Sequence, residues 1–138
     1  MDDCLQALKE RFREEAFARN FGVDILELEP GRALVRMKIT KMMNNIFDVT
    51  HGAAIYAIVD SAFELAVNSH GTVAVALGVN VSYLKPVIPG MTLLAEGREV
   101  SRSSRIAACE IRVTDETGGL IATCQALAYR KKDALPFL

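Results

Sequence analysis

The segment from Thr50 to Gly71, THGAAIYAIVDSAFELAVNSHG, decides the fold of this chain. The pattern predicts one helix opened at His51-Gly52, whose first half is apolar on every side. A helix with that pattern is typically buried inside a protein. Asp60 lies in the middle of this helix, where an unpaired carboxylate is costly to bury. Asp60 is therefore our first candidate for a catalytic residue.

Strand-like runs surround this helix on both sides along the chain. Two such runs, Val23–Leu28 and Ala33–Ile39, flank the turn signal Glu29-Pro30-Gly31-Arg32. In the second run one set of alternate residues is apolar and the other is more polar, which indicates a strand with one face partly exposed to solvent. Four more runs follow the helix, over residues 73–85, 92–101, 105–114 and 120–131. Short turn signals separate these runs, and short connections require antiparallel pairing. We expect an α+β fold in which about six antiparallel strands wrap round the central helix.

Two further segments complete the chain. Residues 2–18 place Leu5, Leu8, Phe12 and Ala16 on one face, which predicts a single amphipathic surface helix. Residues 41–50, KMMNNIFDVT, show neither a helix nor a strand period, and we expect an ordered loop there. A chain of 138 residues, 51% of them hydrophobic, suits one domain over residues 1–138.

Composition argues against several classes of protein. The formal net charge of -1 gives no reason to expect nucleic acid or an anionic membrane as a partner. The apolar segment is interrupted by Asp60 and Glu64 and is too short to span a bilayer. The acidic start, Met1-Asp2-Asp3, is unlike a signal peptide. We expect no metal site and a cytoplasmic protein with three free thiols, at Cys4, Cys109 and Cys124.

The order of these motifs resembles that of a known family. The chain resembles a hotdog-fold protein in the order of its parts. A surface helix and two strands come first, and a loop with Asn follows. His-Gly then opens a buried helix that carries Asp eight residues after the Gly, and four strands complete the order. More narrowly, the motif Asn45…His51-Gly52…Asp60-Ser61-Ala62-Phe63…Asn68-Ser69 resembles acyl-CoA thioesterases of the phenylacetate-degradation type. Tyr83-Leu84-Lys85-Pro86 fits the strand that follows the helix in this family.

The resemblance runs from about residue 5 to residue 131. It implies a single hotdog thioesterase domain that hydrolyses acyl-CoA. It also implies a homodimer or homotetramer, with no metal and no cofactor beyond the coenzyme A of the substrate.

These residue types suit thioester hydrolysis. The carbonyl oxygen gains negative charge in the transition state, and the Gly52 N–H, unpaired at the positive end of the helix, would stabilise it. Asp60 would attack the carbonyl carbon or take a proton from water, and the sequence leaves both open. Asn45 would bind the thioester or orient the water, and His51 would donate a hydrogen bond or hold the loop. Each residue also has a purely structural interpretation. Asp60 would cap or brace a neighbouring loop, Gly52 would allow a tight helix start, His51 would be a structural hydrogen-bonded side chain, and Asn45 would be a turn residue.

The spacing of Gly52 and Asp60 has a consequence for assembly. Eight residues of helix rise about 12 Å, so the two groups of one chain cannot touch the same thioester. If both are catalytic, they come from different subunits, with two helices antiparallel across a two-fold axis.

Glu64 is the main departure from the family pattern. It lies one turn beyond Asp60 on the same helical face, where relatives often have a small or hydroxylated side chain. Two nearby carboxylates raise the pKa of one of them, so Glu64 would hold a proton or close off the acyl pocket. Alternatively, Glu64 pairs with a basic residue such as Arg36.

The substrate-binding candidates follow from the resemblance to enzymes of coenzyme A. Cations at strand ends would contact its phosphates, although exposed basic residues at turns are also common without a ligand; they are Lys85, Arg102 and Arg105. Large side chains would line the acyl pocket or belong to the core; they are Ile46, Phe47, Ile55, Tyr56, Val59 and Phe63, with Tyr83 added from the strand after the helix. Their size hints at an aromatic or medium-chain acyl group without fixing it.

Two other functions stay open. One is a hydratase or dehydratase of acyl thioesters, which usually pairs His with Asp or Glu. His51 is too far from Asp60 for this within one chain, though not across a dimer. The other is an acyl-CoA-binding module without catalysis, against which the presence of Asp60 argues.

Overall fold

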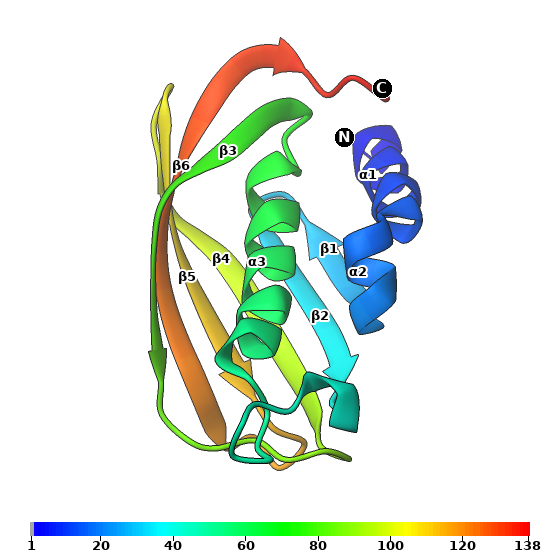
Figure 1. Ribbon diagram of the computed structural model, residues 1–138. Helices are drawn as coiled ribbons and strands as arrows, with labels where there is room; N and C mark the ends of the chain where they lie inside the picture. The colour runs from blue at the N-terminus through cyan, green and yellow to red at the C-terminus, as the bar shows by residue number, and fades with distance from the viewer. Residues whose placement is uncertain (1) are drawn as a thin grey trace.

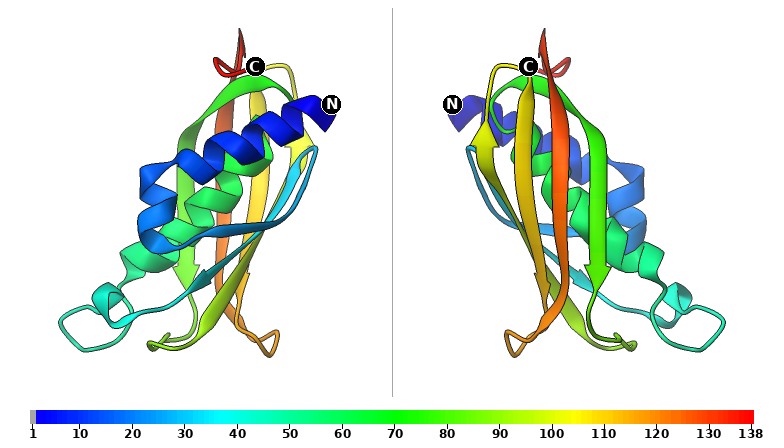
Figure 2. Two further views of the ribbon diagram at one scale, coloured as in Figure 1. Left: turned by 90° about the vertical axis from the view of Figure 1, so that its right-hand side faces the viewer. Right: turned by 90° about the vertical axis from the view of Figure 1, so that its left-hand side faces the viewer.

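A six-stranded antiparallel sheet curves round one long helix in the computed structural model, which describes residues 2–138 (Figure 1, Figure 2). The strands are β1 (Asp24–Glu29), β2 (Arg32–Lys38), β3 (Thr72–Tyr83), β4 (Thr92–Arg102), β5 (Ile106–Thr114) and β6 (Leu120–Ala134), in the spatial order β1-β2-β4-β5-β6-β3. The helices are α1 (Asp2–Glu14), α2 (Ala16–Phe21) and α3 (Gly52–Asn68), with a 3₁₀ turn η1 (Lys41–Met43). The expected α+β architecture is confirmed, with strand bounds within about three residues of the prediction.

The core lies between α3 and the concave face of the sheet. Ile58, Ala62 and Leu65 of α3 are fully buried, as the all-round apolar pattern of the helix predicts. They meet the inward-facing residues of the strands, such as Val35 of β2 and Ile111 of β5, which are fully buried too. Strand alternation turns the residues between them to the outer face, among them Arg36 of β2 and Arg112 of β5. None of the helices within residues 2–138 is long and apolar enough to cross a membrane.

The N-terminal helix differs from the prediction. Residues 2–18 do not form one helix: α1 ends at Glu14, and Glu15 takes an extended conformation (φ −67°, ψ 113°) before α2 begins. The break lets Phe12 of α1 and Ala18 of α2 both be buried while the chain bends round α3. In Figure 1, α3 lies between the sheet and the α1–α2 segment. The prediction was wrong because the apolar residues keep helical spacing on both sides of Glu15. Their periodicity therefore does not indicate where one helix ends and the next begins.

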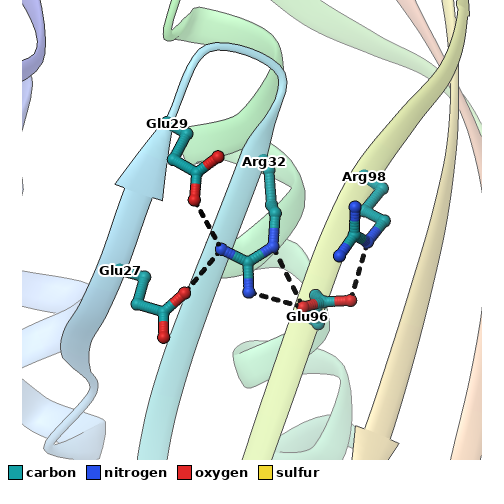
Figure 3. A network of polar contacts seen from close by, with 5 residues as sticks. All are labelled: Glu27, Glu29, Arg32, Glu96 and Arg98. Carbon is teal, nitrogen blue, oxygen red and sulfur yellow. Dashed lines mark hydrogen bonds and ion pairs between the residues drawn. The ribbon is translucent and has the colours of Figure 1, made fainter.

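The outer face of β1, β2 and β4 carries a network of ion pairs centred on Arg32 (Figure 3). Its Nη1 atom lies 2.6 Å from Glu27 and 3.1 Å from Glu29, and its Nη2 atom lies 2.7 Å from Glu96. Glu96 also accepts a hydrogen bond from Arg98 at 2.8 Å. Arg98 and Arg32 lower the pKa of Glu96, and the glutamates raise the pKa of Arg32. One guanidinium thus links three strands at the β1 side of the sheet.

Candidate active site

Gly52 supplies a free backbone donor at the start of α3. The preceding residue, His51, caps the helix: its Nδ1 atom accepts from the N–H of Ala53 at 2.9 Å, and its carbonyl oxygen accepts from Ala54 at 3.0 Å. The Gly52 N–H has no hydrogen-bond partner in the part of the chain that the structure describes. This amide therefore stays available at the positive end of the helix.

His51 holds this end of the helix in place. Its N–H donates to the carbonyl oxygen of Met43 at 2.7 Å, and Thr50 N–H donates to Val87 at 2.9 Å. Because Nδ1 accepts the capping hydrogen bond, the neutral ring carries its proton on Nε2. The loop-holding role of His51 is thus visible in the geometry, and within residues 2–138 no hydrogen bond involves its Nε2 atom.

A depression of about 310 Å³ opens beside Gly52. Its walls are the helix start, the end of β3 and the turn that follows; they comprise Thr50, Gly52, Ile55, Tyr83, Leu84, Lys85, Pro86 and Val87. A Cβ atom on Gly52 would lie 3.4 Å from Cζ of Tyr83, so glycine keeps the backbone uncovered beside the ring. Four of the residues singled out from the sequence meet at this depression: Gly52, Ile55, Tyr83 and Lys85.

Asp60 lies further along α3 as a half-buried carboxylate. No ion pair among residues 2–138 involves it. Burial raises the pKa of Asp60, and the negative charge of Glu15 raises it further. Tyr56, one turn earlier, and Cys124 of β6 have pKa values raised by burial and by Asp60, so both lie near this carboxylate. Asp60 is thus a poorly solvated base without a counter-ion, a feature common at active sites.

Glu64 lies one turn beyond Asp60 and faces the α1–α2 segment. Burial, a hydrogen bond with Glu15 and the charges of Glu15 and Asp60 raise the pKa of Glu64 to about 8. The alternative partner considered from the sequence is wrong: Arg36 lies on an exposed face, with Nη2 3.5 Å from Asp24.

Asn45 organises the loop before α3. Its Oδ1 atom accepts from the N–H of Phe47 at 2.8 Å and from that of Val49 at 3.4 Å, so the side chain closes a turn. Phe47 and its neighbour Ile46 are 76% and 90% exposed at the tip. Within one subunit these two side chains therefore line no pocket, contrary to the expectation for the acyl site.

The other acyl-pocket candidates divide between core and surface. Val59 and Phe63 are almost fully buried in the main hydrophobic core, so within this subunit they are core residues. Ile55 is also in the core but borders the depression beside Gly52. Tyr56 stays partly exposed next to Asp60 and is the large α3 side chain best placed to meet a substrate.

The three predicted phosphate-binding cations lie at two ends of the sheet. Lys85 follows β3 near Gly52, whereas Arg102 ends β4 and Arg105 precedes β5. The register places the Ile106 end of β5 against Tyr129 of β6, far from the Tyr83 end of β3. The Arg105 guanidinium lies over the Tyr129 ring, 6.0 Å from its centroid. Lys85 and the two arginines of one subunit thus cannot bind the same phosphate.

Sequence reasoning missed Glu15 as a neighbour of Asp60. Nothing in its local sequence distinguishes it from Glu14, which pairs with Arg11 at 3.4 Å on the surface. Only the break between α1 and α2 turns Glu15 towards α3, so no sequence pattern pointed to it.

A model of the family described as the Thioesterase superfamily matches residues 47–122, from the loop before α3 to the start of β6. The chain belongs to the thioesterase superfamily. It is an enzyme, and the hotdog fold and the family resemblance predicted from the sequence are confirmed.

Relatives of this thioesterase cover most of its length. A predicted esterase of Archaeoglobus fulgidus is 37% identical over 112 residues, which are 81% of this chain and 73% of that protein. Acyl-coenzyme A thioesterase PaaI of Escherichia coli is 28% identical over 119 residues, 86% of this chain and 85% of its own length.

Solved structures agree with these sequence matches. The Escherichia coli PaaI protein from the phenylacetic acid degradation operon matches with a TM-score of 0.91 at 26% identity, covering 95% of both chains. A Streptococcus mutans protein bound to acetyl CoA matches with a TM-score of 0.78 at 25% identity, over 82% of this chain and 91% of its own.

Proposed function

We propose that this thioesterase hydrolyses acyl-CoA to a free acid and coenzyme A. The observation that carries the proposal is that one buried helix presents two functional groups, the Gly52 N–H at its start and the Asp60 carboxylate in its middle, and that neither is bound to another group within residues 2–138. The relatives support the substrate class, since the Escherichia coli protein is named an acyl-coenzyme A thioesterase and the Streptococcus mutans protein was solved with acetyl CoA.

In the proposed reaction, the Gly52 N–H donates a hydrogen bond to the carbonyl oxygen as it becomes an oxyanion. Asp60 attacks the carbonyl carbon, or it takes a proton from the water that does so. The C–S bond breaks, the thiolate of coenzyme A leaves and takes a proton, and the oxygen of water ends in the acid. This route needs no metal and no cofactor beyond the coenzyme A of the substrate.

We further propose that each site uses Gly52 of one subunit and Asp60 of another. The two residues are about 12 Å apart along α3, too far to act on one carbonyl within a chain. Within residues 2–138, β3 is an edge strand that pairs only with β6, so its outer edge is open, and its Val75 and Leu77 side chains are exposed beside that edge. Pairing two β3 edges in a homodimer, alone or within a tetramer, would cover this edge and set the two α3 helices antiparallel.

The remaining predicted residues have roles in the same proposal. His51 Nε2–H and the amide nitrogen of Asn45 would donate to the thioester or to the attacking water. Phe47, exposed at its loop tip, would contact the acyl group in a site shared with the other subunit, together with Tyr56. Coenzyme A phosphates would lie against cations; these are Lys85 beside Gly52, and Arg102 and Arg105 at the other end of the sheet.

A thiol-release assay over a panel of acyl-CoA substrates tests the proposed reaction and narrows the acyl group in one experiment. We expect free coenzyme A to appear with at least one substrate. Loss of water from a 3-hydroxyacyl-CoA without thiol release would favour the dehydratase. Tight binding of acyl-CoA without turnover would favour the binding module. The capping role of His51 already occupies one of its ring nitrogens, which supports hydrolysis over dehydration.

A further inference from the structure

We propose that the loop tip formed by Ile46 and Phe47 of one subunit docks into an apolar depression on a second copy of this chain. The depression lies between α1, α3, the start of β3 and the C-terminal segment. The proposal rests on the shared Gly52–Asp60 site proposed above. It goes beyond that site because it assigns the exposed loop a place on the partner and a part in closing the partner's site.

Hydrogen bonds fix the shape of this loop tip. The Asn45 Oδ1 atom accepts from the N–H of Phe47 at 2.8 Å, and the Asn45 N–H donates to the carbonyl oxygen of Val49 at 2.7 Å. Asp48 takes a left-handed conformation with φ 59°, which closes the turn. Ile46 and Phe47 are held outward, 90% and 76% exposed. Two large apolar side chains on a preformed turn need little further ordering to bind, so they form a surface suited to a partner.

A depression of about 290 Å³ lies near the opposite end of α3. Arg11, Glu15 and Glu64 border it, but most of the side chains that line it are apolar, among them Leu8, Phe12, Leu65, Val73 and Phe137. A cavity of about 150 Å³ with apolar walls is large enough for a benzene ring. The depression therefore has room for the ring of Phe47 and part of Ile46, and it offers both a largely apolar surface.

The antiparallel arrangement of α3 brings the loop tip and the depression together. In the shared site, Gly52 of one copy lies beside Asp60 of the other, with the two helices running in opposite directions. The chain that precedes Gly52 therefore continues alongside the residues that follow Asp60 in the second copy. Those residues include Leu65, which lines the depression. The loop before α3 thus approaches the depression of the second copy and not its own.

The length of the chain allows this contact. Phe47 is five residues before Gly52, and a stretch of that length spans at most about 18 Å when extended. Leu65 is five residues beyond Asp60, which is about 7.5 Å along the helix. The loop also lies on the side of the molecule where a partner would pair, since both views of Figure 2 show it projecting from the body past the β3 edge. Pairing two β3 edges would carry this projection over the second α3.

Docking would close the proposed site at one end. Glu64 lies one turn beyond Asp60 and borders the depression, so a loop tip seated there covers the α3 face beyond the Asp60 carboxylate. An acyl group bound at Asp60 would then meet Phe47 of the other copy. Phe47 thereby limits the length of the acyl group that the site accepts.

Cross-linking between introduced cysteines tests the contact without substrate. Ile46→Cys and Pro136→Cys are combined in a Cys4→Ser background, since Cys4 is partly exposed whereas Cys109 and Cys124 are buried. Within one chain the two positions lie beyond opposite ends of α3, because the Leu135 N–H donates to the carbonyl oxygen of Gly71 at 3.0 Å. A short bismaleimide should therefore join two chains into a covalent dimer.

The matched control pairs Ile46→Cys with Arg36→Cys in the same background. Arg36 is exposed on the outer face of β2, towards the opposite edge of the sheet from β3. This pair should give no covalent dimer.

The strength of the dimer gives a second readout. Phe47→Asp should raise the dissociation constant of the dimer by at least about tenfold, because a charge cannot enter the apolar depression without losing its water. Leu26→Asp makes the same change at an exposed apolar position on β1, at the opposite edge of the sheet, and should leave the constant unchanged. Analytical ultracentrifugation measures both constants.

The absence of a cross-link in a dimeric protein, an unchanged dissociation constant in Phe47→Asp or a monomeric wild type would overturn the proposal. Thiol release separates this outcome from the test of the proposed function. A cross-linked dimer that hydrolyses no acyl-CoA supports the docked loop and contradicts the enzymatic proposal. An active enzyme that stays uncross-linked supports hydrolysis and contradicts the docked loop. In an active enzyme, Phe47→Ala should accept longer acyl groups than the wild type does, and an unchanged preference would contradict the closing role of Phe47.

Discussion

Gly97 of β4 lies directly against Ala62 of α3: a Cβ atom on Gly97 would be 3.0 Å from the carbonyl oxygen of Ala62 and 3.2 Å from its carbonyl carbon. Both residues are buried in the core between the sheet and the helix. Ala62 is two residues after Asp60, so this glycine sets how closely the helix that carries the catalytic candidate approaches the sheet.

We expect Gly97→Ala to lower the free energy of unfolding by about 1–3 kcal/mol, because the new methyl group meets helix backbone that cannot turn aside. Thiol release should fall too, since α3 must shift. A Cβ atom on Gly78 of β3 would have no neighbouring atom within 4 Å, so Gly78→Ala should change stability by less than about 0.5 kcal/mol. Chemical denaturation measures both; equal losses in the two variants would contradict the role of Gly97.

Asp60→Asn should fold normally and lose about 10²–10⁴-fold in kcat/KM, because it keeps the shape of the side chain but removes the base or nucleophile. Asp133→Asn, at an exposed position near the end of β6, is the matched control and should keep wild-type activity. Near-wild-type turnover in Asp60→Asn would remove this residue from the mechanism, and Glu64 would be the next candidate.

The same Asp60→Asn change should raise the melting temperature at neutral pH. The carboxyl has a higher pKa in the folded protein than its unfolded value of about 3.9, so the folded state favours the protonated form. Ionised Asp60 therefore destabilises the fold, and this penalty grows as pH rises above the unfolded value until it is complete above the folded pKa. Calorimetry at several pH values should show that the difference in melting temperature between Asp60→Asn and wild type becomes smaller as pH falls. A variant with a lower melting temperature than wild type at pH 7 would contradict the prediction.

Mixed subunits test whether the site is shared. Gly52→Pro removes the proposed oxyanion donor, and the conformation of His51 (φ −63°, ψ 139°) suits a residue before proline at the first helical position. Mixing this inactive variant with Asp60→Asn should restore about a quarter of wild-type activity, since half of the dimers then contain one complete site of two. The absence of any recovery, after demonstrated subunit exchange between two folded variants, would exclude the shared site.

Arg32→Met should lower the free energy of unfolding by about 1–2 kcal/mol, because it leaves three glutamates without their common partner. Arg36→Met is the control, since Arg36 makes one exposed ion pair with Asp24 at 3.5 Å. Its loss should change the free energy of unfolding only slightly. The pKa of Glu96 is lowered in the fold, so its contribution is present above the unfolded value of about 4.3 and is lost as pH falls through the folded pKa. Denaturation at about pH 7 and about pH 3 should therefore show a smaller effect of Arg32→Met in acid.

Local patterns in the sequence determined the main elements of this protein. The apolar helix, its start at His51-Gly52 and the isolated charge of Asp60 follow from burial and periodicity, which act within a few residues. Short turns between the strand runs required antiparallel pairing, and one apolar helix required a sheet to cover it. The roles of Gly52 and Asp60 stay predictions, as does the shared site.

Only the tertiary structure decided which distant residues meet. It turned Glu15 towards Glu64, placed Val59 and Phe63 in the core, exposed Phe47 and put Lys85 at the end of the sheet opposite Arg102. Helical spacing continues through the bend at Glu15, so the periodicity of the chain carries no sign of it. The bend exists because α1 and α2 must both pack their apolar side chains as the chain passes round α3, and that requirement arises only once the sheet and the helix have come together.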